Sequence, residues 1–253
     1  MRVVQISDCH VSAPEGPTYR GADPRATLRA LVDRIIDWSP DVVLATGDMS
    51  EDGSAASYAW LEEELRRIPA PVLATPGNHD DADRLCAHFA DCAVDAPLSL
   101  EDDWQLVLAG SAKPGEIGGR FDDAQLEALE KTLAGTDRPA LVALHHQPWP
   151  VGSPWIDRYA LASPEAFISV LGRHPRVRLV VWGHVHQDVR IEGQGLTGLG
   201  APSTVSNSLP HQARFTIDPA GPACRWLELE RDGRFRTGLL RPGSGRASGS
   251  VAR

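Results

Sequence analysis

The segment Val42-Val43-Leu44-Ala45-Thr46-Gly47-Asp48 is the most informative part of this chain, because a short apolar run stops at a glycine and a carboxylate. Apolar, β-branched runs of this length predict a fully buried strand. Polar residues directly after such a strand lie at its carboxyl end, which is where ligands bind in open α/β sheets. The segment therefore predicts an α/β fold with a functional site at the carboxyl ends of its strands.

The same pattern recurs four more times along the chain. Apolar runs near residues 3, 71, 140 and 177 end at the polar clusters Asp8-Cys9-His10, Gly77-Asn78-His79-Asp80, His145-His146 and Gly183-His184-Val185-His186. The glycines allow sharp turns and close backbone approach. Loops at the carboxyl ends of several strands can meet although they are distant in sequence. We therefore expect all five clusters to converge on one point.

The donor atoms of these clusters are carboxylate and amide oxygens and imidazole nitrogens, without a thiolate cluster. This mixture suits divalent or trivalent metal ions, and it offers more ligands than a single zinc site uses. Several imidazoles also disfavour magnesium and calcium, which prefer shells of oxygen. The clusters therefore predict two neighbouring metal ions and a metallohydrolase.

Helix and strand signals alternate through most of the chain. Asp23 followed by Pro24 is typical of a helix start, and Ser54 is typical of another. Asp232-Gly233 is a turn signal for a hairpin. The other expected elements are helices that reach about Phe89 and span 122–133 and 163–172 (capped by Ser163), strands at 104–109, 188–191 and 214–217, and the hairpin itself at 225–240.

From this order we expect one domain over residues 1–241 with a four-layer α/β/β/α sandwich, in which two facing sheets carry helices on their outer faces. A C-terminal β-hairpin completes the domain. Residues 242–253 are rich in glycine, serine and arginine, and they are expected to form a disordered tail.

Composition narrows the class of protein. The net charge of −9 argues against a partner as long and anionic as nucleic acid, and no apolar run approaches the ~20 residues that span a bilayer. The N-terminal segment enters a strand without a basic region, so a cytoplasmic location is expected. The four cysteines form no CxxC pair, and free thiols in a reducing compartment fit them best, with a Cys86–Cys92 disulfide as the less favoured alternative.

The succession Asp-x-His, Gly-Asp, Gly-Asn-His-Asp, His, Gly-His-x-His over residues 1 to about 190 resembles the calcineurin-like metallophosphoesterase superfamily. The segment His145–Asp157, and Gly183–Gln187 followed by Ala201-Pro202-Ser203-Thr204, are similar in particular to bacterial class III cyclic-nucleotide (cAMP) phosphodiesterases. Gln147 departs from this pattern, since relatives often carry proline there.

The resemblance implies a ligand set for each metal ion. The first ion would be held by Asp8, His10, His186 and Asp48, and the second by Asp48, Asn78, His145 and His184. Asp48 is the natural bridge because one carboxylate has two oxygens. Two metal ions held in this way share a hydroxide that acts as the nucleophile. The family commonly pairs iron with manganese, while zinc or cobalt also suit the donors.

Two further residues are expected to take part in catalysis. His79 lies next to a ligand and is expected to protonate the leaving alkoxide or stabilise the transition state, the role that the family gives to the matching histidine. Asp80 is expected to orient the His79 ring.

The resemblance implies an enzyme that hydrolyses small phosphodiesters, with 3′,5′-cyclic nucleotides such as cAMP foremost. Glycerophosphodiesters, other small diesters and 2′,3′-cyclic nucleotides remain alternatives, because the metals contact only the phosphate. A non-catalytic protein-binding scaffold is a remote alternative. The existence of a homodimer through the 225–240 hairpin is left open. So are the roles of four residues: Trp149 and Trp155 (base stacking, loop anchoring or a dimer contact), His146 (support of a ligand) and His211 (surface or site).

Overall fold

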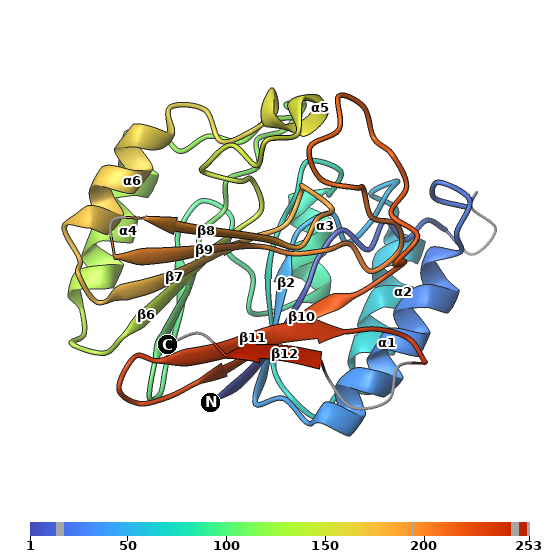
Figure 1. Cartoon of the computed structure of the whole chain (residues 1–253), viewed down its shortest axis with the longest axis horizontal. Helices are drawn as coiled ribbons and strands as arrows, with labels where there is room; N and C mark the ends of the chain where they lie inside the picture. The colour runs from blue at the N-terminus through green and yellow to red at the C-terminus, as the bar shows by residue number, and fades with distance from the viewer. Residues whose placement is uncertain (14–17, 194, 244–247, 252–253) are drawn as a thin grey trace.

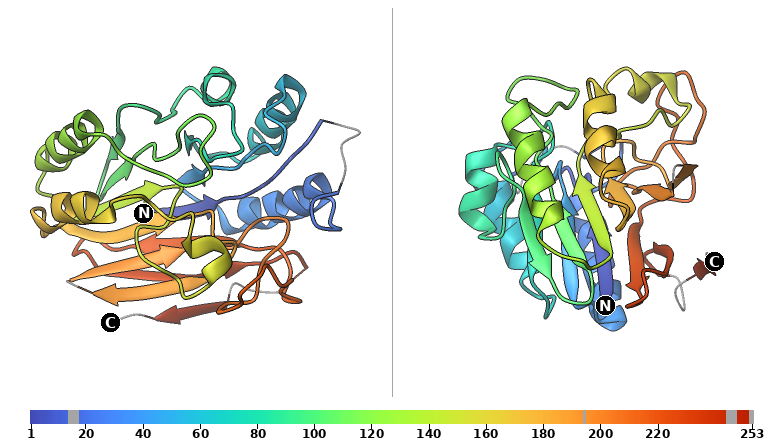
Figure 2. Two further views of the ribbon diagram at one scale, coloured as in Figure 1. Left: turned by 90° about the horizontal axis from the view of Figure 1, so that it is seen from above. Right: turned by 90° about the vertical axis from the view of Figure 1, so that its left-hand side faces the viewer.

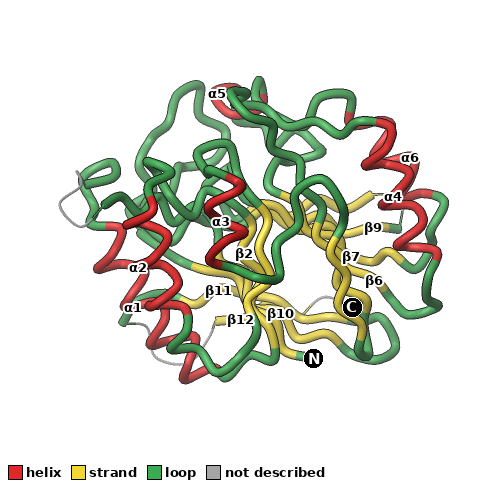
Figure 3. Tube along the Cα trace, turned by 180° about the vertical axis from the view of Figure 1, so that it is seen from behind, coloured by secondary structure: helices red, strands yellow, loops and turns green. Residues whose placement is uncertain are grey.

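Two six-stranded sheets face each other, and helices cover the outer face of each (Figures 1 and 2). The computed structural model describes residues 1–13, 18–193, 195–243 and 248–251. Helices α1, α2 and α3 lie on one side of the strands, and α4 and α6 lie on the other (Figure 3). This is the predicted α/β/β/α sandwich.

The first sheet has the order β12-β11-β10-β1-β2-β3, in which β1, β2 and β3 run parallel and the other pairs run antiparallel. The second sheet has the order β4-β5-β6-β7-β9-β8 and is parallel from β5 to β9. The strands of the first sheet are β1 (Arg2–Ile6), β2 (Val42–Thr46), β3 (Val72–Thr75), β10 (Cys224–Leu229), β11 (Phe235–Leu240) and β12 (Ser248–Val251). Those of the second are β4 (Leu98–Glu101), β5 (Gln105–Leu108), β6 (Ala140–Leu144), β7 (Val177–Trp182), β8 (Val189–Gly193) and β9 (Leu196–Gly200).

Three apolar cores separate the four layers, because successive side chains of a strand point to opposite faces of its sheet. Val4 and Ile6 of β1 pack under the helices of the first sheet, whereas Val3 packs between the two sheets. Phe167 of α6 packs on the outer face of the second sheet. The helices are α1 (Pro24–Trp38), α2 (Ala55–Leu65), α3 (Ala82–His88), α4 (Asp123–Ala134), α5 (Pro154–Asp157) and α6 (Pro164–Gly172).

The predicted helix starts are mostly confirmed by their capping contacts. The Asp23 side chain accepts from the first turn of α1, and the Ser54 side chain accepts the N–H of Ser57 at the start of α2. Ser163 does precede α6, but it adopts a φ of 49° and makes no side-chain capping bond. In the described residues no helix is both long and apolar enough to cross a bilayer.

Several elements differ from the sequence-based expectation. The short strands β4 and β9 and the single-turn helix α5 are not predicted, and residues 214–217 form only an isolated bridge between Ser208 and Ile217. Strand β9 contains Gly198 and Gly200, which weaken strand propensity. A Cβ atom at Gly198 would approach the Trp182 ring to 2.8 Å, so these glycines make room for the tryptophan of β7.

Part of the predicted tail is also paired. Residues Ser248–Val251 form β12, which runs antiparallel to β11. The expectation of disorder is therefore wrong for these four residues. The expectation for 244–247 and 252–253 lies outside the described residues.

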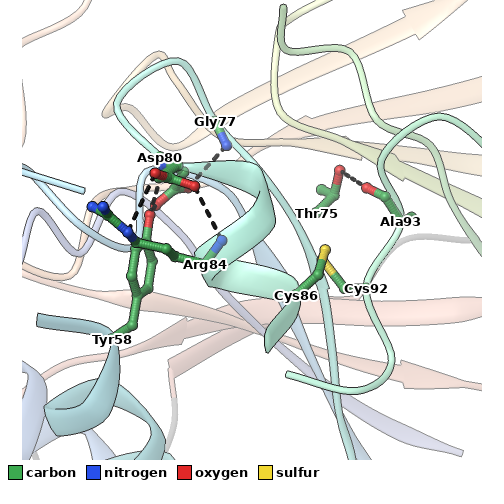
Figure 4. The surroundings of a disulfide bond; sticks show 9 residues. Tyr58, Thr75, Gly77, Asp80, Arg84, Cys86, Cys92 and Ala93 are labelled. Carbon is green, nitrogen blue, oxygen red and sulfur yellow. Dashed lines mark hydrogen bonds and ion pairs between the residues drawn. A yellow bond between two sulfur atoms is a disulfide. The ribbon is translucent and has the colours of Figure 1, made fainter. Parts of the chain in front are cut away.

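A disulfide between Cys86 and Cys92 corrects the prediction of free thiols for this pair (Figure 4). After α3 the chain turns back along β3: Ala74 donates to Asp91 O, and Ala93 donates to Ala74 O. This return brings the Cα atoms of the two cysteines to 5.3 Å, within disulfide range. The pairing depends on a backbone path that the cysteine spacing alone does not show. Cys9 and Cys224 are buried free thiols, as predicted.

Removing the disulfide by Cys86→Ala with Cys92→Ala is expected to lower the free energy of unfolding by about 2 kcal/mol, because it closes only a short loop. Urea denaturation with and without dithiothreitol measures this. The reductant should destabilise the wild-type protein and leave the double variant unchanged. Equal stability of oxidised and reduced wild-type protein would contradict the expectation.

Candidate metal centre

The five polar clusters meet beyond the carboxyl ends of β1, β2, β3, β6 and β7. In a first group, His186 Nε2 lies 3.2 Å from His10 Nε2 and 3.2 Å from Asp8 Oδ1. Ligand atoms of these three buried residues all lie within 4.8 Å of one another. They are close enough together to hold one ion.

A second group adjoins the first. His145 Nε2 lies 3.3 Å from Asn78 Oδ1 and 3.5 Å from Asp48 Oδ2. The same Asp48 oxygen lies 3.9 Å from His10 Nε2. Asp48 is therefore placed between the two groups, as a carboxylate that bridges two ions must be.

The surroundings of His184 indicate whether these residues fit a pair of metal ions. Its ring is buried, and its Nε2 atom meets no hydrogen-bond partner within the described parts of the chain. The ring centroid lies 5.0 Å from that of His145, and the His184 backbone N–H donates to Asp8. A buried polar atom without a partner is costly unless a ligand satisfies it. The borderline donor set and this nitrogen both fit a pair of transition-metal ions.

The outer nitrogens of three imidazoles are held by fixed partners. His145 Nδ1 lies 2.7 Å from Thr46 O, His186 Nδ1 lies 2.8 Å from Ser206 O, and His10 Nδ1 lies 2.7 Å from Glu51 Oε2. A ring N–H that donates outward leaves the other nitrogen free to bind a metal. These contacts turn all three Nε2 atoms toward the centre.

Five of the seven predicted ligands have a left-handed backbone. A non-glycine residue in this region costs about 1–3 kcal/mol, and such outliers concentrate at functional sites. Each outlier turns the chain sharply after its strand, so that the side chain returns over the centre. The five residues are Asp8, His10, Asp48, His184 and His186, with φ between 46° and 66°.

The His79 ring is oriented by Glu51, a residue that was not among the sequence-based predictions. Glu51 Oε2 lies 3.1 Å from His79 Nδ1 as well as 2.7 Å from His10 Nδ1. The Glu51 carboxylate raises the pKa of His79 to about 9. The His79 side chain is 38% exposed, so a molecule in solution can reach its ring. The available signal was the position of Glu51, three residues after Asp48 on the same loop.

Asp80 does not contact the His79 ring, which corrects the expected orienting role. Its carboxylate accepts the backbone N–H of Gly77 (2.9 Å) and the hydroxyl of Tyr58 (3.0 Å) (Figure 4). It also accepts the backbone N–H of Ser50 (2.9 Å). Burial, followed by the nearby Asp48 charge, raises the pKa of Asp80 to about 6. Asp80 therefore ties the loop after β2 to the loop after β3.

Asp48 and His145 are a buried pair of opposite charge, with 3.5 Å between Asp48 Oδ2 and His145 Nε2. Burial alone would raise the pKa of Asp48, but His145 holds it well below the usual range. Burial would likewise lower the pKa of His145, but Asp48 raises it to about 9. A metal ion would have to displace this proton, so its binding should release protons.

The residues whose roles the sequence left open are now placed. His146 uses both ring nitrogens, with Nδ1 2.9 Å from Ser111 Oγ and Nε2 3.1 Å from Ile117 O. Trp149 packs 5.8 Å from the Trp182 ring, while Trp155 lies edge-on to Phe215 at 5.1 Å. His211 is exposed, and its backbone N–H donates to Ser153.

A cavity of about 590 Å³ adjoins the centre beside Asn78 and His79. Asp81, Asp95 and Lys113 are among its charged lining residues. Its volume is that of a small-molecule site.

Gly77→Ala is expected to destabilise the protein by about 1–3 kcal/mol and to weaken metal binding, because the new Cβ would lie 2.1 Å from Asp48 Oδ1. Thermal melts and metal titration of the purified variant measure the two effects. Gly172→Ala is the matched control, since nothing lies within 4 Å of its added Cβ. Wild-type metal affinity in Gly77→Ala would show that Asp48 is not confined as described.

Residues 1–188 match the calcineurin-like phosphoesterase family. The chain is 36% identical over 242 residues to 3′,5′-cyclic adenosine monophosphate phosphodiesterase CpdA of Pseudomonas aeruginosa, covering 94% of this chain and 89% of that protein. It is 32% identical over 246 residues to CpdA of Escherichia coli K12, covering 95% and 90%. Among solved structures, a dimetal phosphatase from Danio rerio shares the fold, with a TM-score of 0.76, 16% identity and coverage of 99% and 98%. This chain therefore belongs to the calcineurin-like phosphoesterase family.

Proposed function

We propose that this protein is a metal-dependent phosphodiesterase that hydrolyses 3′,5′-cyclic nucleotides, with cAMP foremost. The observation that carries the proposal is the convergence of two ligand groups on either side of Asp48. Relatives named as cAMP phosphodiesterases, 30% to 36% identical over most of the chain, direct the proposal to cyclic nucleotides among the small diesters.

The proposed ligands are Asp8, His10, His186 and Asp48 for one ion and Asp48, Asn78, His145 and His184 for the other. Iron with manganese is the proposed pair, with zinc or cobalt as alternatives. When bound, two such ions supply a nucleophile at neutral pH and polarise the phosphoryl group.

The proton for the leaving group comes from His79. Glu51 holds its Nδ1, so Nε2 is the nitrogen free to donate. The Glu51 carboxylate raises the pKa of this ring to about 9, which favours the protonated form that a general acid needs before it acts. The adjacent cavity gives room for the departing part of a small diester.

Other parts of the proposal concern the protein as a whole. We propose residues 1–241, with β12 as the edge strand of the first sheet, as the catalytic domain, a small diester as the partner, and a cytoplasmic location. Disulfides are rare in that compartment, so the Cys86–Cys92 disulfide is the feature of the structure that argues against this location. We also propose a homodimer that forms through β10 and β11. A non-catalytic scaffold is disfavoured, because it would not need the complete set of metal ligands.

The substrate assignment predicts that metal-loaded protein hydrolyses cAMP with a higher kcat/KM than 2′,3′-cyclic nucleotides or glycerophosphodiesters. Asp48→Ala should lower cAMP hydrolysis on the order of 10³-fold or more, because both ions lose a ligand. The His88 ring pairs with Glu62 outside the centre, so His88→Ala is the control and should remain active. Preference for another diester would reassign the substrate, and an active Asp48→Ala would refute the site.

His79→Ala should slow cAMP hydrolysis about 10²-fold or more, because the alkoxide leaving group loses its proton donor. A p-nitrophenyl diester has a leaving group that needs no proton, so its hydrolysis should fall much less. The ratio of the two losses in kcat is the measurement. Equal losses on both substrates would remove the acid role from His79.

A further inference from the structure

A group of aromatic residues borders the first ligand group. We call Tyr19, Arg20, Trp155 and Phe215 the aromatic rim. The Tyr19 ring stacks on His10, with centroids 4.0 Å apart and planes 5° apart. Phe215 meets His186 edge-on at 6.0 Å, and Trp155 meets Phe215 at 5.1 Å. Two distant segments thus bring the Tyr19 and Phe215 rings next to the ligands His10 and His186, and a third packs Trp155 behind Phe215.

Arg20 is the cation of this rim. Its guanidinium carbon lies 3.7 Å from the Phe215 ring centroid and 5.3 Å from that of Tyr19. The residue is exposed, and no carboxylate of the described ranges pairs with it. Among the described residues most arginines pair with a carboxylate, whereas Arg20 contacts the Phe215 ring and the Tyr19 side chain, so its charge is available to a ligand.

The backbone that presents Arg20 is strained. Tyr19 and Ala22 exchange two backbone hydrogen bonds of 2.9 and 3.0 Å, which close a two-residue turn. The φ angles within it are 48° at Arg20 and 84° at Gly21. Asn, Asp or Gly is preferred at the first position of such a turn, so arginine is held there at a conformational cost. Outliers of this kind are typical of ligand clamps.

We propose that Arg20, seated on Phe215, is a specificity-determining residue that stacks on the nucleobase of the substrate while the phosphate lies at the metal centre. The inference rests on the proposed function, because it concerns the same site. A planar guanidinium stacks on aromatic faces in a way that an ammonium does not. Any base offers such a face, whereas a glycerophosphodiester has none. The rim would therefore favour nucleotides over diesters without a ring.

The test is calorimetric titration of the metal-loaded protein with AMP, ribose 5-phosphate and inorganic phosphate. None of these is a diester, so the measurement does not depend on turnover. Wild-type protein should bind AMP more tightly than ribose 5-phosphate. Arg20→Asn keeps the left-handed turn and should raise the Kd for AMP about tenfold, with little change for ribose 5-phosphate. Arg20→Lys keeps the charge and should lose most of the same preference.

Arg214→Ala is the matched control, because it removes an exposed arginine next to Phe215. It should bind all three ligands as the wild-type protein does. An unchanged Kd for AMP in Arg20→Asn would overturn the inference, and so would equal losses for AMP and ribose 5-phosphate, which would mark a phosphate contact. Wild-type protein that hydrolyses cAMP yet shows no preference for AMP would overturn the inference alone. Loss of the AMP preference in Arg20→Asn, in a protein inactive on cAMP, would support the rim and refute the proposed activity.

Discussion

Neighbouring groups of the described residues enclose the carboxylate of Asp48. One oxygen accepts the backbone N–H of His79 at 2.9 Å, and the other faces His145 and His10. Gly77 packs so closely that no side chain fits between them. Strands β2 and β3 pair with Thr46 opposite Thr75, so the loops after them start side by side. The imidazoles of His10 and His145 are positioned directly against this carboxylate.

The same region joins the two sheets. His145 follows β6 of the second sheet and contacts Thr46 O of the first at 2.7 Å. Gln5 of β1 donates to both Thr46 and Trp182 O, which belong to different sheets. Polar contacts at the carboxyl ends therefore complete the apolar packing between the sheets. A ligand that binds only the folded centre should stabilise the whole sandwich, because binding favours the native state.

The surroundings of the centre differ in chemistry from one side to the other. The cavity beside His79 is lined by several carboxylates, and it adjoins the proposed proton donor. The aromatic rim beside His10 and His186 offers ring faces and one exposed guanidinium. A small nucleotide has both a flat aromatic base and a phosphate ester. The asymmetry of the centre matches such a molecule better than a diester without a ring.

The layer order, the helix caps at Asp23 and Ser54 and the meeting of five clusters followed from sequence, because strand period, cap chemistry and strand-end polarity are local signals. The strand β9 and the Cys86–Cys92 disulfide did not, because both depend on which distant backbone lies alongside. The contact to the His79 ring was not predicted for the same reason: adjacency in sequence gives Asp80 no contact with that ring, while the turn after Asp48 brings Glu51 to it. Residue types thus determined which chemistry this chain can perform. Only the tertiary structure decided which side chain holds which, since that depends on how strained turns aim the side chains in space.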